Sequence, residues 1–179
     1  YGVWHDNISE FYSSMLTGIN FSPPLYFLFN FLLQLIFPTS IEQLRIQSLI
    51  FIIIGIILSF LLARRIFGNA AAFIATILVA SQSSLLLSQA QEARHYAMFF
   101  ACGTWVLYTQ SFHNIAVKKY RWITFLAHFC LCQVHYLGII FSLLSGVAYF
   151  LTSKNKGLWK RIPISITICW LLSIVSYLF

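Results

Sequence analysis

The sequence predicts an all-α fold, namely a polytopic helical membrane domain with about six spans and with interfacial helices in its first outer loop. Two observations predict this class. Of the 179 residues, 60% are apolar and only 8% are charged, whereas roughly a quarter of the residues in a soluble domain are charged. Long apolar runs also recur along the chain, with short basic clusters between them, as in spans joined by cytoplasmic loops. This pattern excludes a soluble enzyme, a disulfide-rich secreted scaffold and a disordered chain.

Residues 1–43 are predicted to form an outer loop that contains interfacial helices. The apolar segment 25–37 lies in this loop, between Pro23-Pro24 and Pro38. A membrane span needs ~20 residues, and proline disfavours helix continuation at both ends of the segment. We therefore expect 25–37 to form an interfacial or re-entrant helix and not to cross the membrane.

Residues 44–179 are predicted to form one incomplete transmembrane domain. Four apolar runs have the length of a single span, and they are Leu44–Leu62, Ala70–Leu87, Tyr96–Phe112 and Ile162–Phe179. A longer run, Trp122–Leu151, has a basic cluster at each end, and both clusters are cytoplasmic only if this run crosses twice. We therefore predict two short spans with a turn near 133–135. Because the chain starts at Tyr1 and ends in an apolar run, we expect it to be part of a longer protein.

The charges agree with this topology. Nine of the eleven basic residues then lie on the cytoplasmic side, and all four acidic residues lie on the outer side. The net charge of +7 therefore follows the positive-inside rule, and we expect a bilayer but no nucleic acid as a partner. All four cysteines lie in apolar runs and are expected to be small buried residues without disulfides; they are Cys102, Cys130, Cys132 and Cys169.

The polar residues of the predicted outer side form four groups, which the topology brings to one face. They are Trp4-His5-Asp6-Asn7 with Glu10, Ser22-Pro23-Pro24-Leu25-Tyr26, Gln91-Glu92-Ala93-Arg94-His95-Tyr96, and His135-Tyr136. Each group also has a purely structural interpretation. The acids of the first group can be solvated, and Glu92 with Arg94 can be a charged pair at headgroup depth. His135 can hydrogen-bond a helix end, and His128 is expected to be packed within its span.

The order of the motifs resembles that of GT-C type membrane glycosyltransferases that use polyprenyl-phosphate sugars. The resemblance is to protein-mannosyltransferase-like enzymes of glycosyltransferase family 39 and to the related Rgt-type domain. The matching stretches lie within about 2–151, and they are Trp4-His5-Asp6-Asn7, Ser22-Pro23-Pro24-Leu25-Tyr26, Arg45-Ile46-Gln47-Ser48, Arg64-Arg65-Ile66-Phe67-Gly68, Gln91-Glu92-Ala93-Arg94-His95-Tyr96-Ala97 and His135-Tyr136. Two positions depart from the family pattern, because Asn7 replaces a second acid and Ser22 replaces the usual histidine.

The resemblance implies a membrane enzyme that moves a sugar from a polyprenyl-phosphate donor to an acceptor, with inversion. The acceptor would be a lipid, a glycan or a protein, and the site would face outward from a bacterial plasma membrane. Asp6 is the expected catalytic base. The expected partners of the donor phosphate are Arg94, Arg45 and His95, since guanidinium binds phosphate in a bidentate manner. The expected supporting or acceptor-binding residues are Glu10, Asn7, Glu92, His135 and Tyr136. No cofactor is assigned, and Asn7 leaves the use of a divalent metal open.

Two other classes of function stay open at this stage. A transporter or flippase subunit would place ionisable residues near the middle of its spans, whereas this chain concentrates them at one outer face. A catalytically silent relative of the glycosyltransferases is the other alternative, and Asn7 and Ser22 favour it.

Overall fold

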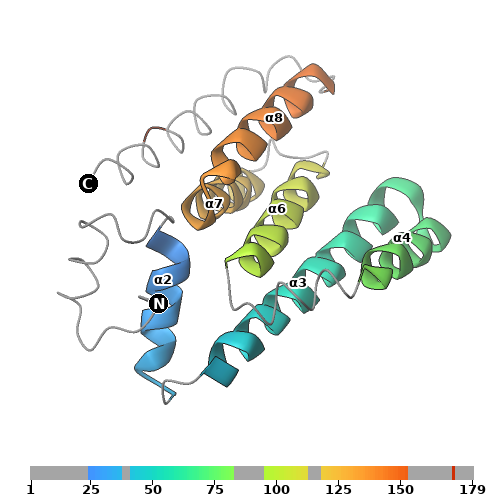
Figure 1. The fold of residues 1–179 in the computed structure, drawn as a ribbon. Helices are drawn as coiled ribbons and strands as arrows, with labels where there is room; N and C mark the ends of the chain where they lie inside the picture. The colour runs from blue at the N-terminus through green and yellow to red at the C-terminus, as the bar shows by residue number, and fades with distance from the viewer. Residues whose placement is uncertain (1–23, 38–40, 83–94, 113–117, 153–170, 172–179) are drawn as a thin grey trace.

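A computed structural model describes residues 24–37, 41–82, 95–112, 118–152 and 171, and the predictions that fall elsewhere in the chain lie outside these residues. The described elements are all helices, which confirms the predicted all-α class (Figure 1). They are α2 (Pro24–Gln34), α3 (Ile41–Phe67), α4 (Asn69–Ser81), α6 (Tyr96–Gln110), α7 (Lys118–Val134) and α8 (Leu137–Thr152).

Helix α3 is the one described helix that is both long and apolar enough to cross a bilayer, over Glu42–Phe67. At 1.5 Å per residue its 27 residues extend about 40 Å, more than the ~30 Å hydrocarbon core. It is longer than the predicted run Leu44–Leu62, because the helix continues into the polar residues at both ends. The other described apolar helices are shorter, so the six-span topology stays a prediction.

The turn after α3 depends on Gly68. Its φ of +89° lies in a region that side chains with a Cβ rarely adopt. The Gly68 N–H donates to the Arg64 carbonyl at 3.0 Å and closes the helix. Helix α4 then folds back, with Phe73 edge-to-face on Phe60 at a centroid distance of 5.5 Å.

Helices α3 and α6 run parallel. Ile52 clusters with Ala97, the Phe100 ring lies against Gly55 one turn further on, and Arg65 donates from Nε to the Ser111 carbonyl at 2.9 Å. The residue numbers of the contacting pairs therefore increase in the same direction on both helices. This is the arrangement expected of two spans that cross the membrane in the same direction. Figure 1 shows α6 beside α3, with α7 and α8 on its other side.

The long apolar run 122–151 is broken into two helices, as predicted. Helix α7 ends at Val134 and α8 begins at Leu137. The Cys132 thiol lies 3.9 Å from the Gly138 carbonyl next to the break, and His128 contacts Ser142 further from it. Helices α7 and α8 are therefore antiparallel, and so their directions fit a run that crosses twice.

A buried polar relay joins α6, α7 and α8. His128 on α7 is 0% exposed, and its Nε2 accepts from Gln110 Nε2 at 3.0 Å. Its Nδ1 then carries the proton and donates to Ser142 Oγ at 2.6 Å. Both ring nitrogens are thus satisfied in the neutral state. This confirms the expectation that His128 is a packed residue.

The apolar core surrounds this relay and extends to α2. Its buried members are Tyr26, Phe27, Met98, Cys102, Val106, Ala127, Leu131 and Val134. Cys102 and Cys132 are buried, as expected, whereas Cys130 is only partly buried. Helix α2 has 11 residues and is only about 16 Å long, too short to cross the ~30 Å core. It packs on α7 and on the first half of α3, where Phe29 meets Phe51.

Close packing at Gly138 gives a testable prediction. A Cβ on Gly138 would overlap the Leu131 carbonyl oxygen, which belongs to the backbone and cannot rotate away, whereas a Cβ on Gly103 meets its nearest atoms at 3.9 Å. We expect Gly138→Ala to lower the free energy of unfolding by about 1–3 kcal/mol, as overpacking does.

The matched control is Gly103→Ala, which should be neutral or stabilising by up to about 1 kcal/mol because alanine favours helix. Unfolding of both variants in detergent, followed by circular dichroism, checks the difference. Equal effects of the two substitutions would contradict the close α7–α8 approach.

Candidate functional site

Three of the four predicted outer groups meet at one end of the helix bundle. Their aromatic and imidazole rings come from α2, from the start of α6 and from the junction of α7 and α8. We call this group the histidine–tyrosine cluster, and its members are Tyr26, His95, Tyr96, His135 and Tyr136. The His95 and His135 ring centroids lie 4.7 Å apart. Tyr26 lies 6.1 Å from His95, and Tyr96 lies 5.7 Å from His135. Residues separated widely in the sequence thus form one site.

His135 is held by the start of α8. Its Nδ1 accepts the Leu137 N–H at 3.0 Å, and its ring contacts Phe99 at a centroid distance of 5.4 Å. The structural interpretation, that His135 hydrogen-bonds a helix end, is therefore confirmed. Since Nδ1 is the acceptor, the neutral ring carries its proton on Nε2. Burial lowers the pKa of His135, so the neutral form is favoured.

His95 and Tyr26 connect α6 to α2. The His95 carbonyl accepts the Phe99 N–H at 2.9 Å and opens α6, while its ring packs between Tyr26 and His135. Tyr26 is almost fully buried. Burial raises the pKa of its hydroxyl, and the Asn30 side chain one turn on opposes this rise. The Tyr26 hydroxyl therefore stays protonated and can donate a hydrogen bond.

The remaining predicted residues have different outcomes. Tyr136 is 57% exposed and lies against His135 at a centroid distance of 4.3 Å, at the rim of the cluster. Arg45 is exposed on α3 and is not among the residues that contact the cluster rings. The others lie outside the described residues, so their roles stay predictions; they are Asp6, Asn7, Glu10, Glu92 and Arg94.

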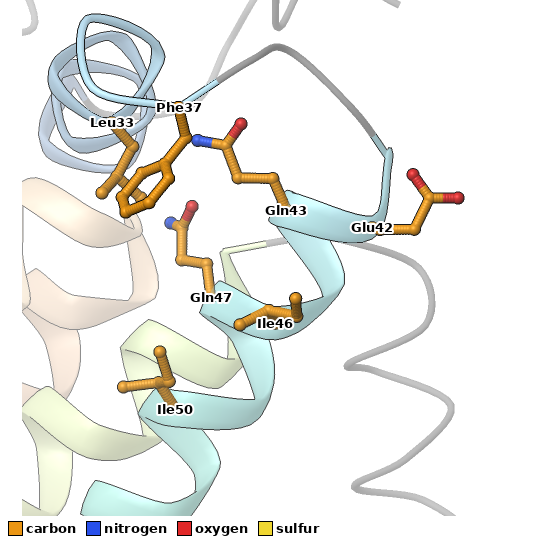
Figure 2. A pocket seen from close by; sticks show the side chains of 7 residues that line it. All are labelled: Leu33, Phe37, Glu42, Gln43, Ile46, Gln47 and Ile50. Atoms are coloured by element: carbon orange, nitrogen blue, oxygen red, sulfur yellow. The ribbon is translucent and has the colours of Figure 1, made fainter.

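An apolar pocket of about 320 Å³ lies between the end of α2 and the start of α3 (Figure 2). It is lined by Leu33, Phe37, Glu42, Gln43, Ile46, Gln47 and Ile50. Gln47 is 3% exposed, and its amide extends toward Phe37 across the pocket. Neither amide atom of Gln47 has a hydrogen-bond partner among the described residues. An unpaired buried amide costs free energy, so Gln47 is suited to meet a polar group of a ligand.

Sequence reasoning did not assign roles to Tyr26 or Gln47, although both stand in the quoted motifs. Gln47 could have been recognised as a candidate binding residue, because it is a polar amide in the first turns of an otherwise apolar helix. Tyr26 gave no local signal, since its role follows from a contact with His95 far along the chain.

The described residues offer two histidines for a metal. Within the described part of the chain no three His, Cys, Asp or Glu side chains come together. His95 and His135 form a pair there, and the use of a divalent metal stays open.

Taken together, the described residues form a helical bundle with one helix long and apolar enough to cross a membrane and with the histidine–tyrosine cluster at one end. A family model described as dolichyl-phosphate-mannose-protein mannosyltransferase matches residues 22–179. The chain belongs to this glycosyltransferase family, which confirms the GT-C type resemblance; members of this type are integral membrane proteins. The matched range contains the whole cluster and begins after Asp6. No curated protein and no solved structure matches the chain.

The lowered pKa of His135 predicts a pH-dependent stability. As the pH falls through the ordinary histidine pKa of about 6.5, the unfolded chain binds a proton that the native ring resists, so this residue makes stability fall. The variant His135→Asn should flatten the dependence, because an Asn oxygen can accept the Leu137 N–H without titrating. Melting temperatures in detergent between pH 7.5 and 5.5 check this, and equal slopes for both proteins would contradict it.

Proposed function

We propose that this protein transfers a sugar from a polyprenyl-phosphate donor to an acceptor hydroxyl at the outer membrane face. In this reaction the acceptor oxygen bonds to the anomeric carbon while the bond from that carbon to the phosphate oxygen breaks. The acceptor proton passes to the Asp6 carboxylate, and polyprenyl phosphate leaves. Direct displacement inverts the anomeric centre. The acceptor is a lipid, a glycan or a protein.

The observation that carries the proposal is the convergence of the histidine–tyrosine cluster within a chain of this family. The rings of Tyr26 and His95 meet at one end of the bundle, and their O–H and N–H groups are proposed to bind the phosphate of the lipid-linked sugar there. His95 follows Arg94 in the chain, and an arginine there would add a bidentate contact to the departing phosphate. In this proposal the cluster supplies hydrogen-bond donors that stabilise the leaving polyprenyl phosphate.

The pocket between α2 and α3 suits the lipid part of the donor. The first turn of α2 contributes Tyr26 to the cluster, and its last turn contributes Leu33 to the pocket. An isoprenoid chain that runs along α2 would therefore place its phosphate at the cluster and its first units in the apolar pocket. Arg45 and Gln47, on the adjoining turns of α3, are proposed to contact the same donor.

A transport function has less support in the described residues. An ion or solute path through the spans uses ionisable groups that can exchange partners. His128 is bonded through both ring nitrogens to Gln110 and Ser142, and so it is a structural residue. The other described histidines lie in the cluster.

Two substitutions test the proposed chemistry. Asp6→Asn should lower sugar transfer by about 10²–10⁴-fold, the usual contribution of a general base, while the protein stays folded, since an acid in a predicted outer loop is expected to contribute little to stability. Arg94→Lys should also reduce transfer strongly, because an ammonium group does not reproduce the guanidinium fork. The measurement is transfer from a lipid-linked sugar in membranes that contain the full-length protein.

The matched control is Arg121→Lys, at the predicted cytoplasmic side, which should retain transfer. Gel filtration with fluorescence detection shows whether each variant is folded. Near-normal transfer by Asp6→Asn would remove Asp6 from the mechanism.

A further inference from the structure

A second pocket lies at the opposite end of the α3–α6 pair. Its volume is about 300 Å³, and it is lined by Leu61, Arg64, Arg65 and Tyr108. Helix α6 begins at the histidine–tyrosine cluster, where Ile52 of α3 meets Ala97, and because the two helices run parallel their last turns form this pocket. The two pockets are thus at opposite ends of the longest helix.

One arginine of this pocket is fixed in place. Arg65 donates from Nε to the Ser111 carbonyl at 2.9 Å, and its guanidinium carbon lies 4.0 Å from the centre of the Phe112 ring. These contacts use Nε and one face of the guanidinium, and they leave its terminal N–H groups as donors. The side chain is therefore ordered before any ligand arrives.

The other polar groups of the pocket are also donors. Arg64 is exposed, and its side chain makes no hydrogen bond or ion pair with a described residue. The Tyr108 ring is held edge-to-face against Phe112 at a centroid distance of 5.0 Å, and its hydroxyl adds a third donor. The lining residues that the structure describes include no acid. Two guanidinium groups and a phenol suit an oxyanion with several acceptor oxygens, which is the chemistry of phosphate.

The position of the pocket indicates a lipid as the source of that phosphate. Residues 46–63 of α3 are uncharged and extend about 27 Å, close to the ~30 Å hydrocarbon core. Arg64 and Arg65 therefore reach headgroup depth. Leu61 lines the pocket, and Ile57, one turn further into the apolar part of α3, is exposed, so acyl chains can lie along α3 below the phosphate.

We propose that this pocket binds the phosphate group of an anionic phospholipid, in the leaflet opposite the histidine–tyrosine cluster. The site is separate from the proposed transfer site and does not depend on it. A lipid bound here links α3 to α6 through Arg65 and stabilises their parallel packing.

Native mass spectrometry of the full-length protein in detergent micelles with added phosphatidylglycerol tests the proposal. We expect saturable binding to the wild type and weaker binding to Arg64→Gln, with a dissociation constant about five- to tenfold higher. Glutamine keeps the helix propensity, and the Arg64 side chain has no hydrogen bond or ion pair with a described residue to lose. Tyr108→Phe, which keeps the ring on Phe112, should raise the constant by about two- to threefold.

Two controls distinguish a lipid-binding pocket from unspecific charge attraction and from a site for a soluble anion. Arg121→Gln removes a charge at the same predicted membrane face and should leave the constant within about twofold. Inorganic phosphate at about 10 mM should not displace the lipid, because a free anion lacks the acyl chains that lie along α3. Wild-type affinity of Arg64→Gln would overturn the proposal. An equal loss of lipid affinity in Arg121→Gln would also overturn it, because that result indicates unspecific charge attraction. Full displacement of the lipid by inorganic phosphate would overturn it as well, because that result indicates a site for a soluble anion.

Discussion

The arrangement of this molecule depends on one buried polar relay, the Gln110–His128–Ser142 hydrogen bonds. In hydrocarbon a polar side chain without a hydrogen-bond partner costs several kcal/mol. Helices α6, α7 and α8 each carry one polar side chain of the relay, so they pack best where these three side chains meet. A single hydrogen bond between membrane helices stabilises by only about 0.6 kcal/mol on average. The relay therefore contributes more to the axial register of α6, α7 and α8 than to their total stability.

The register set by the relay is what forms the histidine–tyrosine cluster. Helices α6 and α7 are antiparallel, since Gln110 meets His128 while Phe99 meets His135. The pairing of Gln110 with His128 therefore aligns α6 with α7 so that His95 lies next to His135 at one end of the bundle. Gly138 permits the same arrangement from the other side, because the lack of a Cβ lets α8 approach the α7 backbone. Helix α2 then covers this end with Tyr26 and carries the apolar pocket.

The sequence was sufficient for features that depend on local patterns. An apolar run between prolines located α2, and the basic clusters at both ends of 122–151 indicated that this run is broken into two helices. The capping role of His135 also followed from its position at a predicted helix end. The pairing of Gln110 with His128 and that of Tyr26 with His95 could not be predicted, because they join distant segments whose contact depends on packing. The acidic part of the site, with Asp6 and Glu10, lies outside the described residues and stays a prediction.

Photo-crosslinking most directly tests the claim that the histidine–tyrosine cluster and the α2–α3 pocket receive the donor lipid. The probe is a polyprenyl phosphate with a diazirine on its first isoprene unit, and it is applied to the full-length protein. Excess phosphatidylglycerol is added to occupy the proposed lipid pocket at Arg64 and Arg65. Mass spectrometry of the peptides should then find adducts within 24–37, 41–50 and 95–99. Adducts confined to 57–67 and 104–112, at the opposite end of α3 and α6, would contradict the account.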